Sequence, residues 1–352
     1  MKTIPRYWAY ARTQLGFLVW RSSPESEAAA RFEAEKSAKR ISSRYERGEA
    51  IADEGEYPYG VTLREKLIGE FDDPQGQLQG FVTRNHDGAE VLNVKNVMFF
   101  DWDTQAKPVP LFGLWQGLKS IFLKNFTWRR LFFPRRPICI SLRDLRGDDW
   151  SRQEEDWAQH PDKPWEQVYP WAAVPELAAF MSTVTQWPDW GVRIYKTCAG
   201  YRGLVTHALF DPTAESTIDL MRQFRCDPMY ISLCKWQESF RARVTPKKWR
   251  CKLWRKQTRS NFRFYYPGRD LVVCDPETPD DVATTLVENA LAEYEVTYDN
   301  AAQTYEQAAA EYATCRYLGT VGSENVHPDI APIIGLHDET TKALSDDMLT
   351  LA

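Results

Sequence analysis

The sequence has few of the features that mark a secreted or a zinc-binding protein. Its seven cysteines form no Cys-x-x-Cys pair and are odd in number, which argues against a disulfide framework and against a zinc site. The N-terminal stretch MKTIPRYWAYARTQ has no apolar run before a cleavage site, so no signal peptide is predicted. We therefore expect a protein of the reducing cytoplasm.

Long apolar runs are missing as well. The most apolar window, VPLFGLWQGLKSIFLKNF, contains Lys119, Lys124 and two glycines, so it is too short and too charged to span a bilayer. We therefore predict no transmembrane segment. An amphipathic helix at a membrane surface is the alternative for this window.

The motifs of several enzyme classes are absent. The sequence has no Gly-x-Ser-x-Gly elbow, P-loop, His-Glu-x-x-His or dinucleotide-binding glycine pattern, which removes the usual hydrolase, NTPase, zincin and dehydrogenase interpretations. Four of the five histidines lack the spacing of metal ligands and are expected to be loop or surface residues: His86, His160, His327 and His337.

The predicted elements indicate an α/β (α+β) fold. A strand at 14–20 precedes a helix at 24–47, for which Ser23 is the expected cap. A hairpin through the turn Asn-His-Asp-Gly joins 80–84 to 89–93. Downstream we expect strands and helices in the order βαββαβ, at 97–103, 175–186, 191–197, 201–207, 213–224 (capped by Asp211 or Thr213) and 228–234.

This order is that of a ferredoxin-like, RRM-like sheet, with helices on one face and the other face free for a site. Three regions follow: an N-terminal strand-helix extension at 1–80, a palm with basic insertions at 81–275, and a C-terminal helical segment at 276–352. The stretch 279–317 is strongly helical by its apolar spacing, and a protein partner is expected to bind through the C-terminal helices.

Two carboxylates end the apolar strand at 97–103. Side chains alternate across a strand, so Asp101 and Asp103 leave the same face. Such a pair repels itself unless a cation or bulk water lies between the two groups. Mg²⁺ or Mn²⁺ prefers carboxylate oxygens, so a metal site is predicted here, with Asp227 as the third ligand. A solvated turn before Pro108 is the alternative for the pair, and an ordinary turn residue is the equally weighted alternative for Asp227.

An aspartate-nucleophile phosphatase of the haloacid-dehalogenase type is a rival for the sequence FFDWDTQ. Its Asp-x-Asp-x-[Thr/Val] motif requires Thr or Val at the fifth position, where this chain has Gln105. The rival therefore becomes a minor one.

Three segments together resemble the core of the archaeo-eukaryotic primase and primase-polymerase superfamily. They are MFFDWD (98–103), KTCAGYRGLVT (196–206) and an aspartate shortly before YISLCKWQESFRARVTPKKWR (230–250), so the resemblance covers about residues 90–250. It implies metal binding by Asp101, Asp103 and Asp227, the predicted catalytic residues. It also implies nucleotide binding by the second motif, to which we assign Lys196, Thr197 and Arg202.

The second motif departs from the family pattern. The family normally has His where this chain has Arg202, and alternation places His207 on the opposite face of the strand. Arginine holds phosphate bidentately, so nucleotide binding is compatible with the change, whereas catalysis is less secure.

Two segments are basic without any acidic residue. Residues 241–269 contain eleven Lys or Arg interleaved with aromatic residues, and residues 118–137 contain six. Cations that track phosphates and aromatic faces that stack on bases predict contact with single-stranded nucleic acid, although a solvated basic face is the alternative for either segment alone. The residues assigned to this contact are Arg241, Arg243, Lys247, Lys248 and Arg250.

The sequence thus predicts a divalent-metal-dependent nucleotidyltransferase of primase-polymerase type, acting on nucleotides and a single-stranded or primed template. A metal-dependent nuclease using the same carboxylates is one alternative. A catalytically inactive nucleic-acid-binding or scaffold protein on a degenerate palm is the other.

Overall fold

The computed structural model describes residues 6–16, 18–48, 64–103, 175–248, 250–251, 262, 264–267, 277–345 and 349–352. These residues form a mixed α+β fold with several antiparallel sheets and six helices. The helices are α1 (Glu27–Glu46), α6 (Pro175–Val184), α7 (Glu215–Gln223), α8 (Pro228–Gln237), α10 (Asp280–Ala309) and α11 (Ala331–Thr341).

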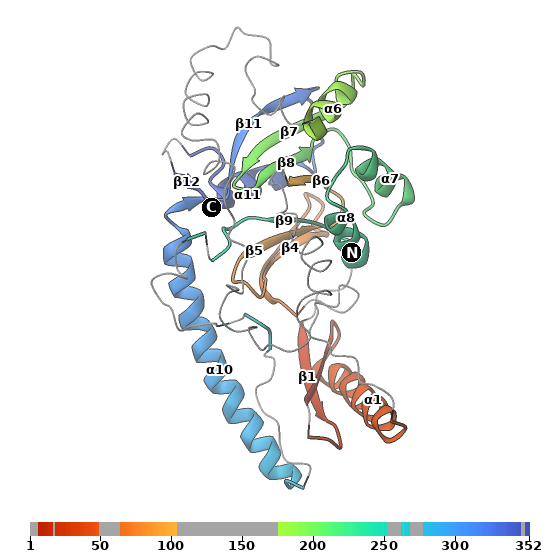
Figure 1. Ribbon diagram of the computed structural model, residues 1–352, viewed down its shortest axis with the longest axis vertical. Coiled ribbons are helices and arrows are strands. Elements are labelled where there is room, and N and C mark those ends of the chain that lie inside the picture. Colours follow the sequence, from red (N-terminus) through yellow and green to blue (C-terminus); the bar gives the residue numbers. More distant parts are fainter. Residues whose placement is uncertain are drawn as a thin grey trace, which may run out of the picture.

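A four-stranded antiparallel sheet carries the aspartate strand. Its order is β11 (Cys315–Gly322), β7 (Gly191–Thr197), β8 (Gly200–Val205) and β6 (Phe99–Asp103), and we call it the upper sheet from its place in Figure 1. One face packs on α6 and α7, where Phe100 contacts Phe180 and Phe224 at ring separations of 5.2 and 5.4 Å. The other face packs on α11, where Phe99 lies 5.7 Å from the ring of His337.

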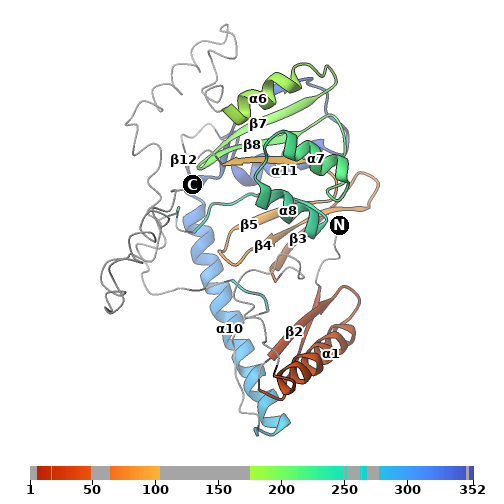
Figure 2. The ribbon, with the colours of Figure 1, turned by 45° about the vertical axis from the view of Figure 1, so that its right-hand side comes forward.

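A second antiparallel sheet lies on the far side of α11. Its order is β3 (Lys66–Asp72), β4 (Leu78–Arg84), β5 (Glu90–Val94) and β9 (Phe240–Arg243), and Figure 2 shows α11 between the two sheets. Inward-facing side chains of both sheets join one buried core, which includes Leu92, Phe240, Ile194 and Ile333. The predicted hairpin is confirmed: Asn85 Oδ1 accepts from the amides of Asp87 and Ala89, and Gly88 has φ +87°.

The expected strand at 228–234 is wrong, because these residues form helix α8. Asp227 caps the helix by accepting a hydrogen bond from the Met229 amide at 2.7 Å, and Pro228 occupies the first turn, where its missing N–H costs nothing. The buried residues Ile231 and Cys234 follow with helical spacing. The fourth strand of the upper sheet is β11, which lies beside β7. Part of this strand was expected to be helical.

Both predicted helix caps are also wrong. Helix α1 is capped by Ser26, whose hydroxyl accepts from the Ala29 amide at 3.1 Å, whereas Ser23 accepts from the amide of Glu25. Helix α7 follows Ala214 without a side-chain cap, because Asp211 instead accepts from the Thr213 amide in the preceding turn. The helices themselves lie where the sequence predicts them.

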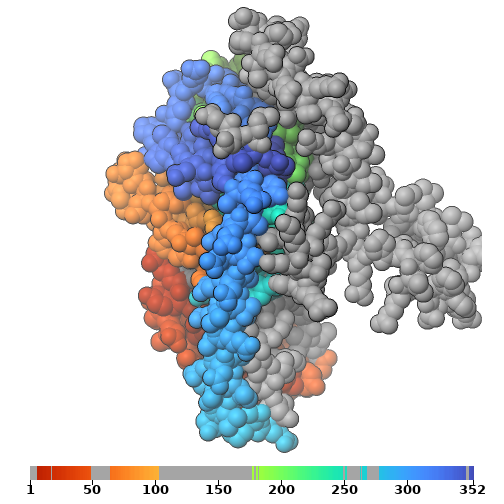
Figure 3. All heavy atoms as spheres, turned by 90° about the vertical axis from the view of Figure 1, so that its left-hand side faces the viewer, coloured from red at the N-terminus to blue at the C-terminus, as the bar shows by residue number. Residues whose placement is uncertain are grey.

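The N-terminal unit pairs a strand that the sequence did not indicate, β1 (Tyr7–Arg12), with β2 (Leu18–Ser23). Tyr10 and Leu18 pack on Ala283 and Val287 near the start of α10. Figure 3 shows α10 running along the outside of the molecule. A short parallel pair, β10 (Tyr312–Ala313) and β12 (Thr350–Leu351), follows α10. Within the described ranges, no helix has both the length and the apolar composition needed to cross a membrane.

Candidate nucleotide site at strand β6

Asp101 lies directly opposite Arg202 on the neighbouring strand β8. Their side chains share the face that looks toward α11, and Arg202 Nε is 3.9 Å from Asp101 Oδ1. The Asp101 side chain is 42% exposed, whereas that of Arg202 is 5% exposed. Strand alternation therefore presents a partly open carboxylate next to a buried cation.

The third predicted residue, Asp227, reaches the same place from another part of the chain. Its backbone amide donates to the carbonyl of Asp101 at 3.1 Å, and the neighbouring Cys226 thiol lies 3.4 Å from the Asp101 amide nitrogen. The fold thus brings residues 101, 202 and 227 together. The Asp227 side chain also serves as the cap of α8, which agrees with its predicted alternative as a turn residue.

Asp103 is the last residue of β6 and pairs with Gly200, but its side chain lies outside the described residues. Among the groups that are described, no three His, Cys, Asp or Glu side chains are arranged to hold a metal ion. Asp101 and Asp227 still offer the oxygen donors that suit Mg²⁺ or Mn²⁺. The donor chemistry therefore fits a hard cation, and a metal site remains a prediction.

Lys196 is not brought to Asp101, and Thr197 is engaged in the turn between β7 and β8. Tyr195 pairs with Arg202 and Lys196 with Tyr201, so alternation places Lys196 on the face opposite Arg202. Lys196 Nζ lies 4.4 Å from the centroid of the Tyr201 ring. The Thr197 hydroxyl accepts from the Gly200 amide at 3.0 Å and so supports the β7–β8 turn.

Arg202 and Arg243 leave an excess of positive charge beside Asp101. Arg202 Nη1 donates to the Arg243 carbonyl at 2.8 Å. The Nε of Arg243 is buried and has no hydrogen-bond partner among the described residues. Burial, together with the nearby charges of Arg250 and Arg202 and against the opposing effect of Asp101, lowers the pKa of Arg243 to about 10. One carboxylate among three guanidinium groups attracts an anion such as phosphate.

The other predicted phosphate contacts divide into two groups. Arg241 is 9% exposed and donates to both carboxylate oxygens of Glu65, at 2.8 and 3.0 Å, so it has an internal partner. Lys247, Lys248 and Arg250 form what we call the basic turn, which the Arg250 amide closes by donating to the Lys247 carbonyl at 2.8 Å. Lys248 Nζ donates to the Phe262 carbonyl at 2.9 Å.

His337, expected from the sequence to be a loop or surface residue, is part of this region. His337 is fully buried in α11, not a surface residue, and its Nε2 is 3.4 Å from Arg202 Nη1. Burial, against the raising effect of the Asp338 hydrogen bond and together with the nearby Arg202, lowers its pKa to about 4, so the ring is neutral at pH 7. No local signal identifies this residue, because its position depends on the packing of α11 against the upper sheet.

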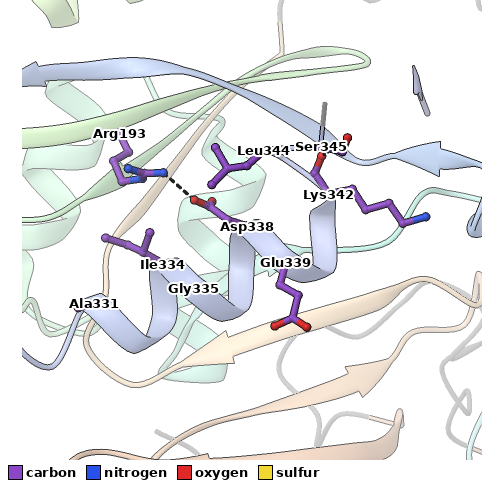
Figure 4. Close-up of a pocket in the computed structure, with 9 residues that line it drawn as sticks. All are labelled: Arg193, Ala331, Ile334, Gly335, Asp338, Glu339, Lys342, Leu344 and Ser345. Atoms are coloured by element: carbon purple, nitrogen blue, oxygen red, sulfur yellow. Dashed lines mark hydrogen bonds and ion pairs between the residues drawn. The ribbon is translucent and has the colours of Figure 1, made fainter. Parts of the chain in front are cut away.

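A hollow lies on the side of α11 that faces away from the second sheet. It is an open hollow of about 690 Å³, lined by Arg193 of β7, by α11 and by the turn after it (Figure 4). The Arg193 guanidinium is 2.6 Å from Asp338 Oδ2 at its base. None of the predicted site residues lines this hollow.

The comparisons with known proteins add no relative. No protein-family model, curated protein or solved structure matches the chain.

Proposed function

We propose that the chain is a metal-dependent nucleotidyltransferase of primase-polymerase type that acts on nucleic acid. The observation that carries the proposal is the convergence of residues 101, 202 and 227, which three separate segments bring to strand β6. Residues 101 and 227 are the predicted metal ligands of the first and third segments, and residue 202 is the position in the second segment where the family normally has His. A single strand or a primed template, nucleotides, and a cytoplasmic setting belong to the proposal.

Each residue has a proposed role. Asp101, Asp103 and Asp227 would hold Mg²⁺ or Mn²⁺, which when bound supplies charge stabilisation for phosphoryl chemistry. Arg202, with Arg243 nearby, binds the nucleotide phosphates. Lys247, Lys248 and Arg250 of the basic turn follow the nucleic-acid backbone, and the internal pair with Glu65 removes Arg241 from this set.

A ferredoxin-like, RRM-like palm is part of the same proposal. Strands β6 and β7 flank β8 and are connected through α6 and the residues before it, which is a split β-α-β arrangement. The last strand of the upper sheet in chain order, β11, lies beside β7, whereas the ferredoxin-like order would place it beside β6. The palm we propose is therefore a variant in which residues 226–227 occupy the outer edge of β6.

The acidic helix α10 is the proposed surface for a protein partner. Its side chains Val282, Leu286 and Val296 are 46%, 48% and 64% exposed. The helix contains seven acidic residues and no Lys or Arg. Three of the seven, Asp280, Asp299 and Glu306, pair with cations of this chain, and the other four favour a basic partner.

A second function is favoured by the position of Arg202. Its Nε lies 3.9 Å from the Asp101 carboxylate, so the protein itself supplies a cation where the family would place a metal. This arrangement suits a catalytically inactive protein that binds nucleic acid through phosphates.

One set of assays separates the proposals. Nucleotide incorporation, nucleotide-independent cleavage and binding are measured on the same primed single strand with Mn²⁺. Asp101→Asn should lower incorporation by orders of magnitude and leave binding intact, because charge stabilisation by a bound metal carries much of such a reaction. The matched control is Asp219→Asn on the exposed side of α7, which should change neither. Cleavage without nucleotide would indicate the nuclease, and binding without either reaction the inactive protein.

A further inference from the structure

A chain of polar side chains crosses the buried face of the upper sheet and ends at Arg202. His337 Nε2 is 3.4 Å from Arg202 Nη1, and His337 Nδ1 is 3.1 Å from Asp338 Oδ1. A guanidinium group can only donate, so Nε2 accepts from Arg202 and Nδ1–H donates to Asp338. The partners thus fix one tautomer of the neutral imidazole.

The far end of the chain is anchored to strand β7. Asp338 Oδ2 accepts from Arg193 Nη2 at 2.6 Å, and Arg193 Nε donates to the Tyr195 hydroxyl at 2.8 Å. The Arg193 guanidinium also lies 4.0 Å from the centroid of the Tyr317 ring. Figure 4 shows the side chains of Arg193 and Asp338 directed toward each other. His337 is therefore fixed on its Nδ1 side by Asp338 and Arg193, and not by Asp101.

The contacts of Arg202 determine which edge of its guanidinium faces the site. Nη1 donates to the Arg243 carbonyl and toward His337, so both of its N–H groups are engaged. Nε faces Asp101 at 3.9 Å. The edge formed by Nε and Nη2 is thus turned to the partly exposed carboxylate, with the geometry for bidentate contact to a phosphate.

We propose that His337 is a positioning residue for Arg202, holding the guanidinium so that its Nε–Nη2 edge meets a nucleotide phosphate beside Asp101. The inference rests on the proposed function, because it names a residue that serves the nucleotide site. The proposal gives this task to a histidine of α11 that is far from the second motif in sequence. In that motif, Arg202 occupies the position where the family normally has His. His337 itself touches no substrate, because its side chain is fully buried.

The test combines three variants of His337 with a matched control. His337→Phe keeps a ring without an acceptor, His337→Asn keeps an amide near the Nδ1 position only, and His337→Gln provides an acceptor near the Nε2 position. Ile333→Val on the same helix is the control, since Ile333 is equally buried and belongs to the apolar core. The affinity for dATP with Mg²⁺ is measured by calorimetry for each variant and for Arg202→Met.

We expect His337→Phe and His337→Asn to weaken dATP binding about tenfold, which corresponds to the strength of a hydrogen bond to a charged group. His337→Gln should restore most of the affinity, and Ile333→Val should leave it unchanged. His337→Phe combined with Arg202→Met should bind no more weakly than Arg202→Met alone, because both changes disable one group. If His337→Phe does not fold, the Asn and Gln variants carry the same comparison.

Two results would overturn the inference in distinguishable ways. Equal dATP affinity of the wild type and the folded Phe and Asn variants would remove the positioning role and leave the proposed function standing. Failure of the wild type to bind any nucleoside triphosphate would refute the proposed function, and the positioning role with it. In that case a double-mutant cycle on unfolding still reports whether His337 and Arg202 are coupled as a purely structural pair.

Discussion

Replacing Arg241 by Met tests whether this residue has a structural role or binds nucleic-acid phosphate. Arg241 lies in the basic segment that the sequence assigned to nucleic acid, yet its guanidinium donates to both oxygens of Glu65. The two side chains are 9% and 2% exposed, and the Thr83 hydroxyl donates to Glu65 Oε2 at 2.6 Å. The substitution removes the Arg241 cation from a buried carboxylate.

The magnitude follows from that burial. Removing one partner of a buried ion pair typically costs about 3–5 kcal/mol, because the remaining charge is uncompensated. The Thr83 hydrogen bond to the carboxylate is present before and after the substitution, so it does not offset this cost. We therefore expect Arg241→Met to lower the free energy of unfolding by about 3–5 kcal/mol. Adding Glu65→Gln should recover most of the loss, since no buried charge then remains.

The assay is urea unfolding at pH 7, with binding to single-stranded DNA measured under folding conditions on the same variants. The control is Lys66→Met, which breaks an exposed pair with Asp299 of 3.0 Å, with the two side chains 34% and 68% exposed. That change should cost at most about 1 kcal/mol. A loss below 1 kcal/mol for Arg241→Met, together with weakened binding to DNA, would refute the structural assignment and return Arg241 to the phosphate contacts.

Three further predictions concern charge, pH and backbone space. Replacing the three cations of the basic turn by Ala should weaken binding to single-stranded DNA and reduce the slope of log affinity against log salt by about 2, because fewer counterions are released; an unchanged slope would assign the turn to another role. The folded-state pKa of His337 is lowered to about 4, so the unfolded chain binds the proton more tightly. The free energy of unfolding should therefore fall as pH decreases from about 6.5 to about 4, by about 3 kcal/mol from this residue, and His337→Phe should lack that part of the dependence in urea titrations across this range. Gly80→Ala would place its Cβ 2.4 Å from the Asn93 carbonyl oxygen and should destabilise the protein by at least about 1–3 kcal/mol. Gly335→Ala in α11 meets open space and should stabilise the protein by about 0.5–1 kcal/mol. Equal unfolding midpoints for the two variants would contradict this expectation.

Elements specified by local chemistry were predictable from the sequence. The Asn85–Gly88 turn carries its own side-chain hydrogen bonds, and the alternation of Asp101 with Phe100 and Trp102 is a property of any strand. Helix α10 follows from its apolar spacing. For these segments, neighbouring residues are sufficient to determine the conformation.

Elements that depend on distant partners were not predictable. Residues 228–234 have strand-like composition, but the Asp227 cap and the proline in the first turn favour the helix α8. Strand β11 forms where β7 offers a free edge, and α11 brings His337 to Arg202 only through packing between the two sheets. The candidate site was thus predicted as separate positions on the chain, whereas the ionic surroundings of Asp101 required the structure.

The outer edges of the upper sheet bear on how the protein behaves at high concentration. At β6, the backbone of Asp101 is bonded to Cys226 and Asp227, and at β11 the Tyr317 amide donates to the Ala343 carbonyl at 3.0 Å. An exposed strand edge is a template for a strand from another molecule, and a covering segment blocks it. The contacts that place Asp227 beside Asp101 therefore also cover the edge of β6. They oppose aggregation in which another molecule adds a strand to this edge.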